Sequence, residues 1–170
     1  SYGGVGFSQA FRDSIEAAMN AGHLFVAAAG NDGSNNDILP TYPASYDLPN
    51  IISVAAVDRN GALAGFSNYG IESVDLAGPG VAILSTLPGD QYGELQGTSM
   101  ASPHVAGVAA LVKAAHPAWE WRDLRTAMLQ NVKELSSLDQ FVNTGGMVNA
   151  FGAVTATGRG LVFYARYDDG

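Results

Sequence analysis

The hydrophobic positions of this chain switch between the spacing of a helix face and the continuous runs of buried strands. Near the N-terminus, Phe11, Ile15 and Met19 lie four residues apart, which is the spacing of one side of a helix. The pattern predicts a helix that begins near Ser8 and ends at Gly22, where a glycine suits the C-terminal cap.

Two short, uninterrupted apolar runs, residues 24–29 and 51–57, are typical of strands buried on both faces of a parallel sheet. A polar loop follows the first run, and the turn signal Asn60-Gly61 follows the second. Two further runs, residues 74–77 and 81–86, predict strands on either side of a Gly-Pro-Gly segment.

The C-terminal half is dominated by helical patterns. The longest helix is expected over residues 99–115, a second over residues 120–130, and a late strand over residues 161–167. Strands that alternate with helices predict an α/β fold, with a mostly parallel sheet flanked by helices. Three good helices are few for covering both faces of such a sheet, so the pattern indicates part of a three-layer fold.

The composition is that of a globular domain, with 47% apolar and 14% charged residues among 170. Eight basic against sixteen acidic residues give a net charge of -8, which argues against a nucleic-acid partner. Without cysteine, disulfides and thiolate metal sites are excluded. No apolar run approaches the ~20 residues that span a bilayer, so no membrane partner is expected.

The chemically informative stretch is the sequence GTSMASPHVAG at residues 97–107. It places Ser99 in the first turn of an apolar helix, after a glycine that allows a substrate backbone to approach. The partial positive charge of a helix N-terminus favours negative charge that develops beside the hydroxyl. An isolated serine at such a position more often serves only as a helix cap.

This stretch resembles the nucleophile motif of the subtilase family of serine proteases, almost residue for residue. The run FVAAAGN at residues 25–31 resembles the family strand that ends in the oxyanion-binding asparagine. The resemblance implies Ser99 as nucleophile and Asn31 as the amide donor to the oxyanion. It covers residues 1–157 as the C-terminal half of a subtilisin-like catalytic domain, and leaves residues 158–170 as a tail or late strand.

The resemblance also implies a set of substrate-binding residues. The N-terminal segment would pair with the substrate backbone as an added strand, and the run before Asn31 would form one wall of a side-chain pocket. A position at the rim of that pocket and the residue before the nucleophile complete the set. In order, these residues are Ser1, Tyr2, Gly3, Ala28, Ala29, Gly30, Thr41 and Thr98.

Serine needs a base, which is itself oriented by a carboxylate. The family presents aspartate and histidine ahead of the serine, and neither block has a counterpart here. His104 points about 140° from Ser99 on the same helix, His116 lies ~25 Å along it, and His23 precedes the Asn31 strand at its far end. The chain is therefore expected to be a fragment, inactive alone, whose partners are a polypeptide substrate and the N-terminal half that carries the aspartate and histidine. Self-association of an exposed sheet edge is the other expected contact.

The sequence is also compatible with another function. A non-catalytic subtilase-like module that binds peptides or serves as a scaffold is the alternative function. An α/β-hydrolase is disfavoured because Ala101 stands where the nucleophile elbow needs glycine. No cofactor is expected; Asp58 is a weak candidate ligand for a structural calcium ion. The family resemblance alone implies an extracellular or cell-envelope location.

Overall fold

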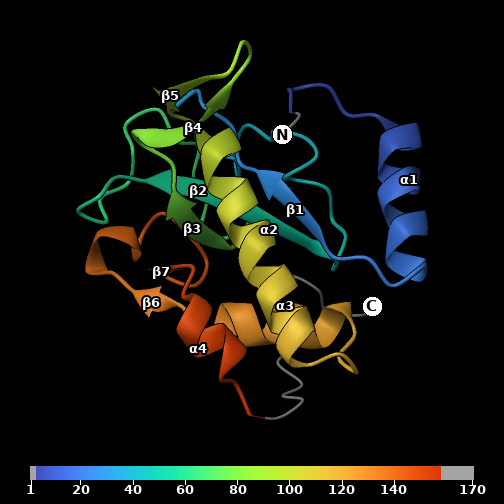
Figure 1. Cartoon of the computed structure of the whole chain (residues 1–170). Helices are drawn as coiled ribbons and strands as arrows, with labels where there is room; N and C mark the ends of the chain where they lie inside the picture. Colours follow the sequence, from blue (N-terminus) through green and yellow to red (C-terminus); the bar gives the residue numbers. More distant parts are fainter. Residues whose placement is uncertain (1–2, 158–170) are drawn as a thin grey trace.

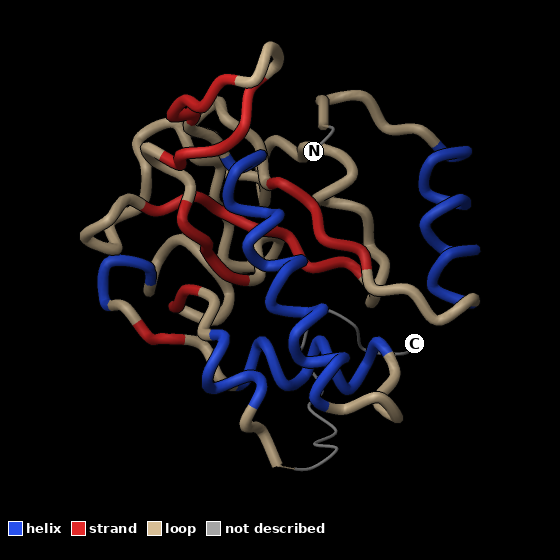
Figure 2. Tube along the Cα trace, viewed as in Figure 1, coloured by secondary structure: helices blue, strands red, loops and turns tan. Residues whose placement is uncertain are grey.

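The computed structural model describes residues 3–157. A five-stranded sheet forms the centre, in the order β1-β2-β3-β7-β6 (Figures 1 and 2). The first four strands of this order run parallel, and β6 pairs antiparallel with β7. The strands are β1 (Phe25–Ala28), β2 (Ile51–Val57), β3 (Leu76–Pro79), β6 (Lys133–Glu134) and β7 (Gly146–Met147). The predicted α/β class with a mostly parallel sheet is confirmed.

Helices cover the two faces of the sheet unequally. The long helix α2 crosses one face in front of β1, β2 and β3, with two shorter helices beside its C-terminal half (Figure 1). A separate helix packs near β1 on the other face, and a short 3-10 turn lies in the loop before β7. These elements are α1 (Gln9–Asn20), α2 (Thr98–Ala115), α3 (Trp121–Gln130), η1 (Ser136–Leu138) and α4 (Ala150–Val154).

The central strand β2 shows why the sheet needs cover on both sides, because all seven of its residues are buried. Val54 and its neighbours two positions away pack into the core beneath α2, together with Val105 and Val112. Ala55 and Val57 point to the other face, where loop residues such as Val142 complete the core. A strand buried on both faces carries no polar alternation, which explains its uniform apolar sequence.

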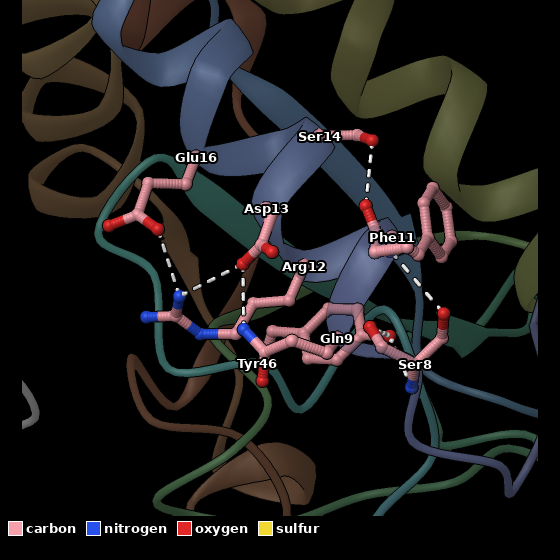
Figure 3. A network of polar contacts seen from close by, with 9 residues as sticks. Ser8, Gln9, Phe11, Arg12, Asp13, Ser14, Glu16 and Tyr46 are labelled. Carbon is pink, nitrogen blue, oxygen red and sulfur yellow. Dashed lines mark hydrogen bonds and ion pairs between the residues drawn. The ribbon is translucent and has the colours of Figure 1, made fainter.

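Helix α1 is fixed at both ends by its own sequence. Ser8 caps the N-terminus by accepting a hydrogen bond from the amide of Phe11, and the Tyr46 hydroxyl bonds both the amide and the carbonyl of Ser8 (Figure 3). Gly22, at φ +89, ends the helix: its amide bonds Met19, and the next amide reaches back to Ala18. The predicted helix is confirmed.

A β-hairpin replaces one of the expected sheet strands. The run at residues 81–86 is predicted as a strand beside the Gly-Pro-Gly segment, but β4 (Ile83–Leu87) leaves the sheet and pairs antiparallel with β5 (Gln91–Leu95). Gly89 and Asp90, both at positive φ, form the turn. The hairpin leads directly into α2, so it connects the sheet to the helix that carries Ser99.

A buried ion pair joins α3 to the sheet. Arg125 lies 2.8 Å from Asp75, which directly precedes β3, and their side chains are 9% and 3% exposed. Asp75 also accepts a hydrogen bond from the amide of Ser53 in β2. This ion pair therefore fixes α3 against strands β2 and β3. Across residues 3–157, no helix combines the length and hydrophobicity that crossing a bilayer requires.

Candidate active site

A cleft of about 320 Å³ opens where β1 ends and α2 begins. In parallel sheets the carboxyl ends of the strands are the usual place for a ligand site. Residues from four separate segments of the chain line this cleft. They are Gly3, Gly4, Val5, Ala28, Gly30, Asn31, Asp32, Thr41, Thr98 and Ser99.

Ser99 is the second residue of α2, not its cap. The N-cap is Gly97, whose φ of 150° and ψ of 162° belong to a region almost confined to glycine. A Cβ at this position would lie 3.6 Å from the Ser99 amide nitrogen and 3.7 Å from Asn31 Nδ2. The two nitrogens therefore border the same space, which the glycine leaves unfilled. The conformation of this glycine is an essential feature that the motif alone did not reveal.

The side chain of Asn31 is held by the residue beside the serine. Its Oδ1 accepts a hydrogen bond from the Thr98 amide at 2.8 Å, and the Thr98 hydroxyl lies 3.0 Å away. The same hydroxyl bonds the backbone of Gly30 on the other side. Because Oδ1 is engaged, the Nδ2 hydrogens are the group that Asn31 can offer to a ligand in the cleft. An amide nitrogen in that position suits an oxygen that acquires negative charge.

The predicted pocket residues divide between the cleft and the core. Ala28, Gly30 and Thr41 line the cleft. Ala29 does not: it has no exposed surface and packs with Val57 and other residues of the opposite face. Successive side chains of a strand point to opposite sides, so adjacent alanines cannot both face the cleft.

The N-terminal segment forms the rim of the cleft. Gly4 and Tyr42 exchange two backbone hydrogen bonds, of 2.9 and 2.8 Å, which hold residues 3–5 beside the opening. Gly3 lies in the lining of the cleft, whereas Ser1 and Tyr2 are outside the described residues. Asp32, not predicted as a site residue, contributes the carboxylate in the lining; its position directly after Asn31 was the available signal.

All three histidines of the chain lie in its described part, and none of them lines the cleft. His104 donates from Nδ1 to the Met100 carbonyl within α2. His116, at the far end of α2, stacks on Trp119 and donates to the Val154 carbonyl. His23 lies in the turn that enters β1, at the opposite end of the strand from the cleft. None of them stands beside Ser99.

Asp58 has a structural task in the turn that follows β2. Its Oδ1 accepts hydrogen bonds from the amides of Asn60 and Ala62, at 2.8 and 3.0 Å. The bonds from Ala62 and Asn60 lower the pKa of the Asp58 carboxyl below its ordinary value. Calcium takes six to eight oxygen ligands, and residues 3–157 contain no group of three or more acidic or histidine side chains that could hold a metal ion. The Asp58 carboxylate thus stabilises the turn, and a calcium ion bound by it stays a prediction from the sequence.

Comparisons with known proteins agree on one family. The model of the subtilase family, peptidase family S8, matches residues 1–154. The chain is 43% identical over 150 residues to the thermostable alkaline protease of Halalkalibacterium halodurans, covering 88% of this chain and 39% of that protein. It is 41% identical over 150 residues to a subtilisin of Bacillus pumilus, covering 88% and 53%. Similarity to subtilisin-like protease 2 of Plasmodium falciparum is 41% over 143 residues, covering 80% and 10%. The chain thus spans about half or less of the length of these relatives.

Proposed function

Because this chain belongs to the subtilase family, we propose that it supplies the nucleophile and the oxyanion-binding half of a serine endopeptidase site. The observation that carries the proposal is the pair of hydrogen bonds from Thr98 to Asn31 Oδ1. These bonds bring the Asn31 amide nitrogen to the helix turn that bears Ser99. A helix cap would need neither an oriented amide nor a cleft. A site for acyl transfer needs both.

In the proposed reaction, Ser99 Oγ attacks the carbonyl carbon of the scissile peptide bond while its proton passes to a base. The negative charge that develops on the carbonyl oxygen is stabilised by Asn31 Nδ2 and the Ser99 amide, and by the positive end of α2. Collapse expels the amine, which takes the proton from the base, and leaves an acyl ester on Ser99. Water then hydrolyses the ester by the same route in reverse.

The base and its orienting carboxylate are assigned to polypeptide outside these 170 residues. The positions of His23, His104 and His116 support this assignment, because none is placed to take the Ser99 proton. The companion would be the half of the catalytic domain that carries aspartate and histidine. The substrate would be an extended polypeptide that lies along residues 3–5, with one side chain between Ala28, Gly30 and Thr41. An extracellular or cell-envelope location is part of the same proposal.

Covalent labelling of Ser99 tests this function. The chain is treated with a fluorophosphonate, alone and after co-expression with the aspartate- and histidine-bearing half, and intact masses are compared. We expect an adduct on Ser99 only in the co-expressed protein, and none in its Ser99→Ala variant. Labelling of the isolated chain would contradict the assignment of the base. A correctly assembled complex without adduct would overturn the peptidase function.

The second candidate is a peptide-binding module without catalysis. It is favoured by one observation: the cleft is lined by this chain's own residues, whereas the histidines lie elsewhere. A fluorescent peptide that binds both the isolated chain and the co-expressed complex, and is recovered intact from both, would support this candidate. Cleavage by the complex would exclude it.

A further inference from the structure

Behind the cleft lies a buried side chain that the proposed reaction does not use. Asn68 follows β2 in the loop that leads to β3, and it has no exposed surface. A buried polar side chain is costly unless its hydrogen-bonding groups are satisfied, so its partners indicate what it stabilises.

The carbonyl end of Asn68 holds the loop that carries Asn31. Its Oδ1 accepts hydrogen bonds from the amides of Asp32 at 2.8 Å and Ser34 at 3.2 Å. Its backbone amide donates to the carbonyl of Gly30 at 2.9 Å. Both chain neighbours of Asn31 are therefore bonded to the same residue.

The amide end of Asn68 reaches the wall of the cleft. Its Nδ2 donates to the Thr41 hydroxyl at 3.2 Å and to Asn36 Oδ1 at 3.0 Å. Asn36, also buried, in turn donates to the carbonyl of Ala29. All four hydrogen-bonding positions of the Asn68 side chain are thus used, and its bonds are divided between the oxyanion loop and the cleft wall.

The fit around Asn68 is tight. Gly30 has a φ of 119°, and a Cβ there would lie 2.4 Å from Asn68 Nδ2. The glycine lets the loop close over the asparagine side chain, and Asn68 then leaves little freedom to residues 30–34. The position of Asn31 is consequently set from two directions, by Thr98 at its side chain and by Asn68 at its backbone.

We propose that Asn68 is a positioning residue that fixes the oxyanion-binding Asn31 and the Thr41 wall of the cleft in one arrangement. The inference rests on the proposed peptidase function for its catalytic meaning. It implies that one substitution outside the cleft alters both turnover and the choice of substrate side chain.

The geometric part is tested without turnover, by amide hydrogen exchange in the 170-residue chain. Asn68→Ala should raise the exchange rate of the Asp32 amide by about tenfold or more, because a buried hydrogen bond to that amide is lost. The matched control is Asn50→Ala, since Asn50 is equally buried but donates to the carbonyls of Ile15 and His23, far from the cleft. It should leave the exchange of Asp32, relative to the amides of β2, unchanged.

A second variant separates the two ends of the side chain. Asn68→Asp keeps an acceptor for the amides of Asp32 and Ser34 but loses the amide group that donates to Thr41 and Asn36. In the complete protease, we expect this variant to keep most of kcat while KM shifts between peptides that differ in the side chain before the scissile bond. Asn68→Ala should lower kcat about tenfold as well. Asn50→Ala should change neither constant.

Several outcomes would overturn the proposal. These are unchanged Asp32 exchange in Asn68→Ala, an equal increase in Asn50→Ala, or a loss of activity that follows global stability in all three variants. If the wild-type complex shows no peptidase activity, the proposed function fails. The exchange measurement on the chain alone then still decides whether Asn68 positions Asn31.

Discussion

The hydroxyl of Thr98, a fully buried residue, contacts both Asn31 and Gly30. Its amide and hydroxyl hold Asn31 Oδ1, and its hydroxyl also bonds the backbone of Gly30. Ser99 next to it thus depends on a residue that itself makes no new bond in the reaction. A threonine suits this position better than an apolar residue of equal shape, because its hydroxyl makes these hydrogen bonds.

Thr98→Val keeps the shape and the backbone amide but removes the hydroxyl. We expect fluorophosphonate labelling of Ser99 in the complete protease to slow by about three- to tenfold, because Asn31 keeps one of two donors. The control is Thr86→Val in the exposed part of the β4–β5 hairpin, which should label at the wild-type rate. Equal slowing in both variants would contradict the role given to the Thr98 hydroxyl.

The lowered pKa of Asp58 determines the sign of its effect on the pH dependence of the unfolding free energy. Its native pKa lies below the unfolded value of 3.8, so the native state binds fewer protons in that range. Its stabilising contribution is complete above the unfolded pKa and is lost as the pH falls through the native one. Between about pH 6 and about pH 3, Asp58→Asn should therefore lose less unfolding free energy than wild type.

Urea unfolding at each pH measures this difference, with Asp47→Asn, an exposed residue of another loop, as the control. Since Asp58 is only partly buried and solvent screens its charge, the difference should be small. A larger acid-induced loss in Asp58→Asn than in wild type would show that the turn bonds do not lower its pKa.

At the scale of elements, the link between α3 and the sheet depends on charge. Arg125 and Asp75 are both buried, and each has hydrogen-bond partners besides the other. A buried pair of this kind contributes little net stability compared with an apolar pair, but half of it is costly to leave behind. The pair thus determines the position of α3 on the sheet more than it adds to the stability of the fold.

Arg125→Met should lower the free energy of unfolding by about 3–5 kcal/mol, because the Asp75 carboxylate is left buried and unpaired. Arg122→Met on the same helix should cost at most about 1 kcal/mol, since the exposed Arg122 only lies over the Trp121 ring at 4.2 Å. Urea denaturation of both variants measures these losses in the free energy of unfolding. A smaller loss of unfolding free energy in Arg125→Met than in Arg122→Met would contradict the role given to the Arg125–Asp75 pair.

The sequence allowed the elements with strong patterns to be predicted. The helix near Ser8, the strand at Ile51–Val57 and the long helix after Gly97 all follow from local periodicity or apolar runs. Strand β5 was missed because Gln91–Leu95 is short and mostly polar, and α4 because it has only five residues.

The candidate site could be predicted only in part, and for physical reasons. Ser99 and Asn31 belong to motifs, so their residues were found in the sequence. Ala29 packs into the core of the opposite face, and an apolar run does not show which residue of a buried strand faces the cleft. The role of Asn68 depends on contacts with residues 27 to 38 positions away, which no local pattern reveals.

At the scale of the whole molecule, the sheet presents an unpaired edge. Strand β1 lies at the end of the sheet and, within residues 3–157, pairs only with β2. Backbone donors and acceptors along such an edge favour addition of another strand. The same edge adjoins the cleft through Ala28, so whatever pairs with β1 also comes close to the site.

The isolated chain should therefore associate with itself, and light scattering at increasing concentration should give masses above 17.6 kDa. Co-expression with the proposed companion half should replace these species by a single one-to-one complex. A stable 17.6 kDa monomer over the whole concentration range would contradict this expectation.

The bond between Asn31 and Thr98 joins residues 67 positions apart in the chain. During synthesis, the amide of Asn31 emerges long before the residue that orients it, and it has no fixed direction until α2 has packed onto the sheet. If the proposed peptidase function holds, this delay protects the chain, because an unfolded polypeptide is readily cleaved and Asn31 is not yet oriented while the chain is unfolded. In the proposed protease, Asn31 can therefore stabilise an oxyanion only after α2 has packed onto the sheet.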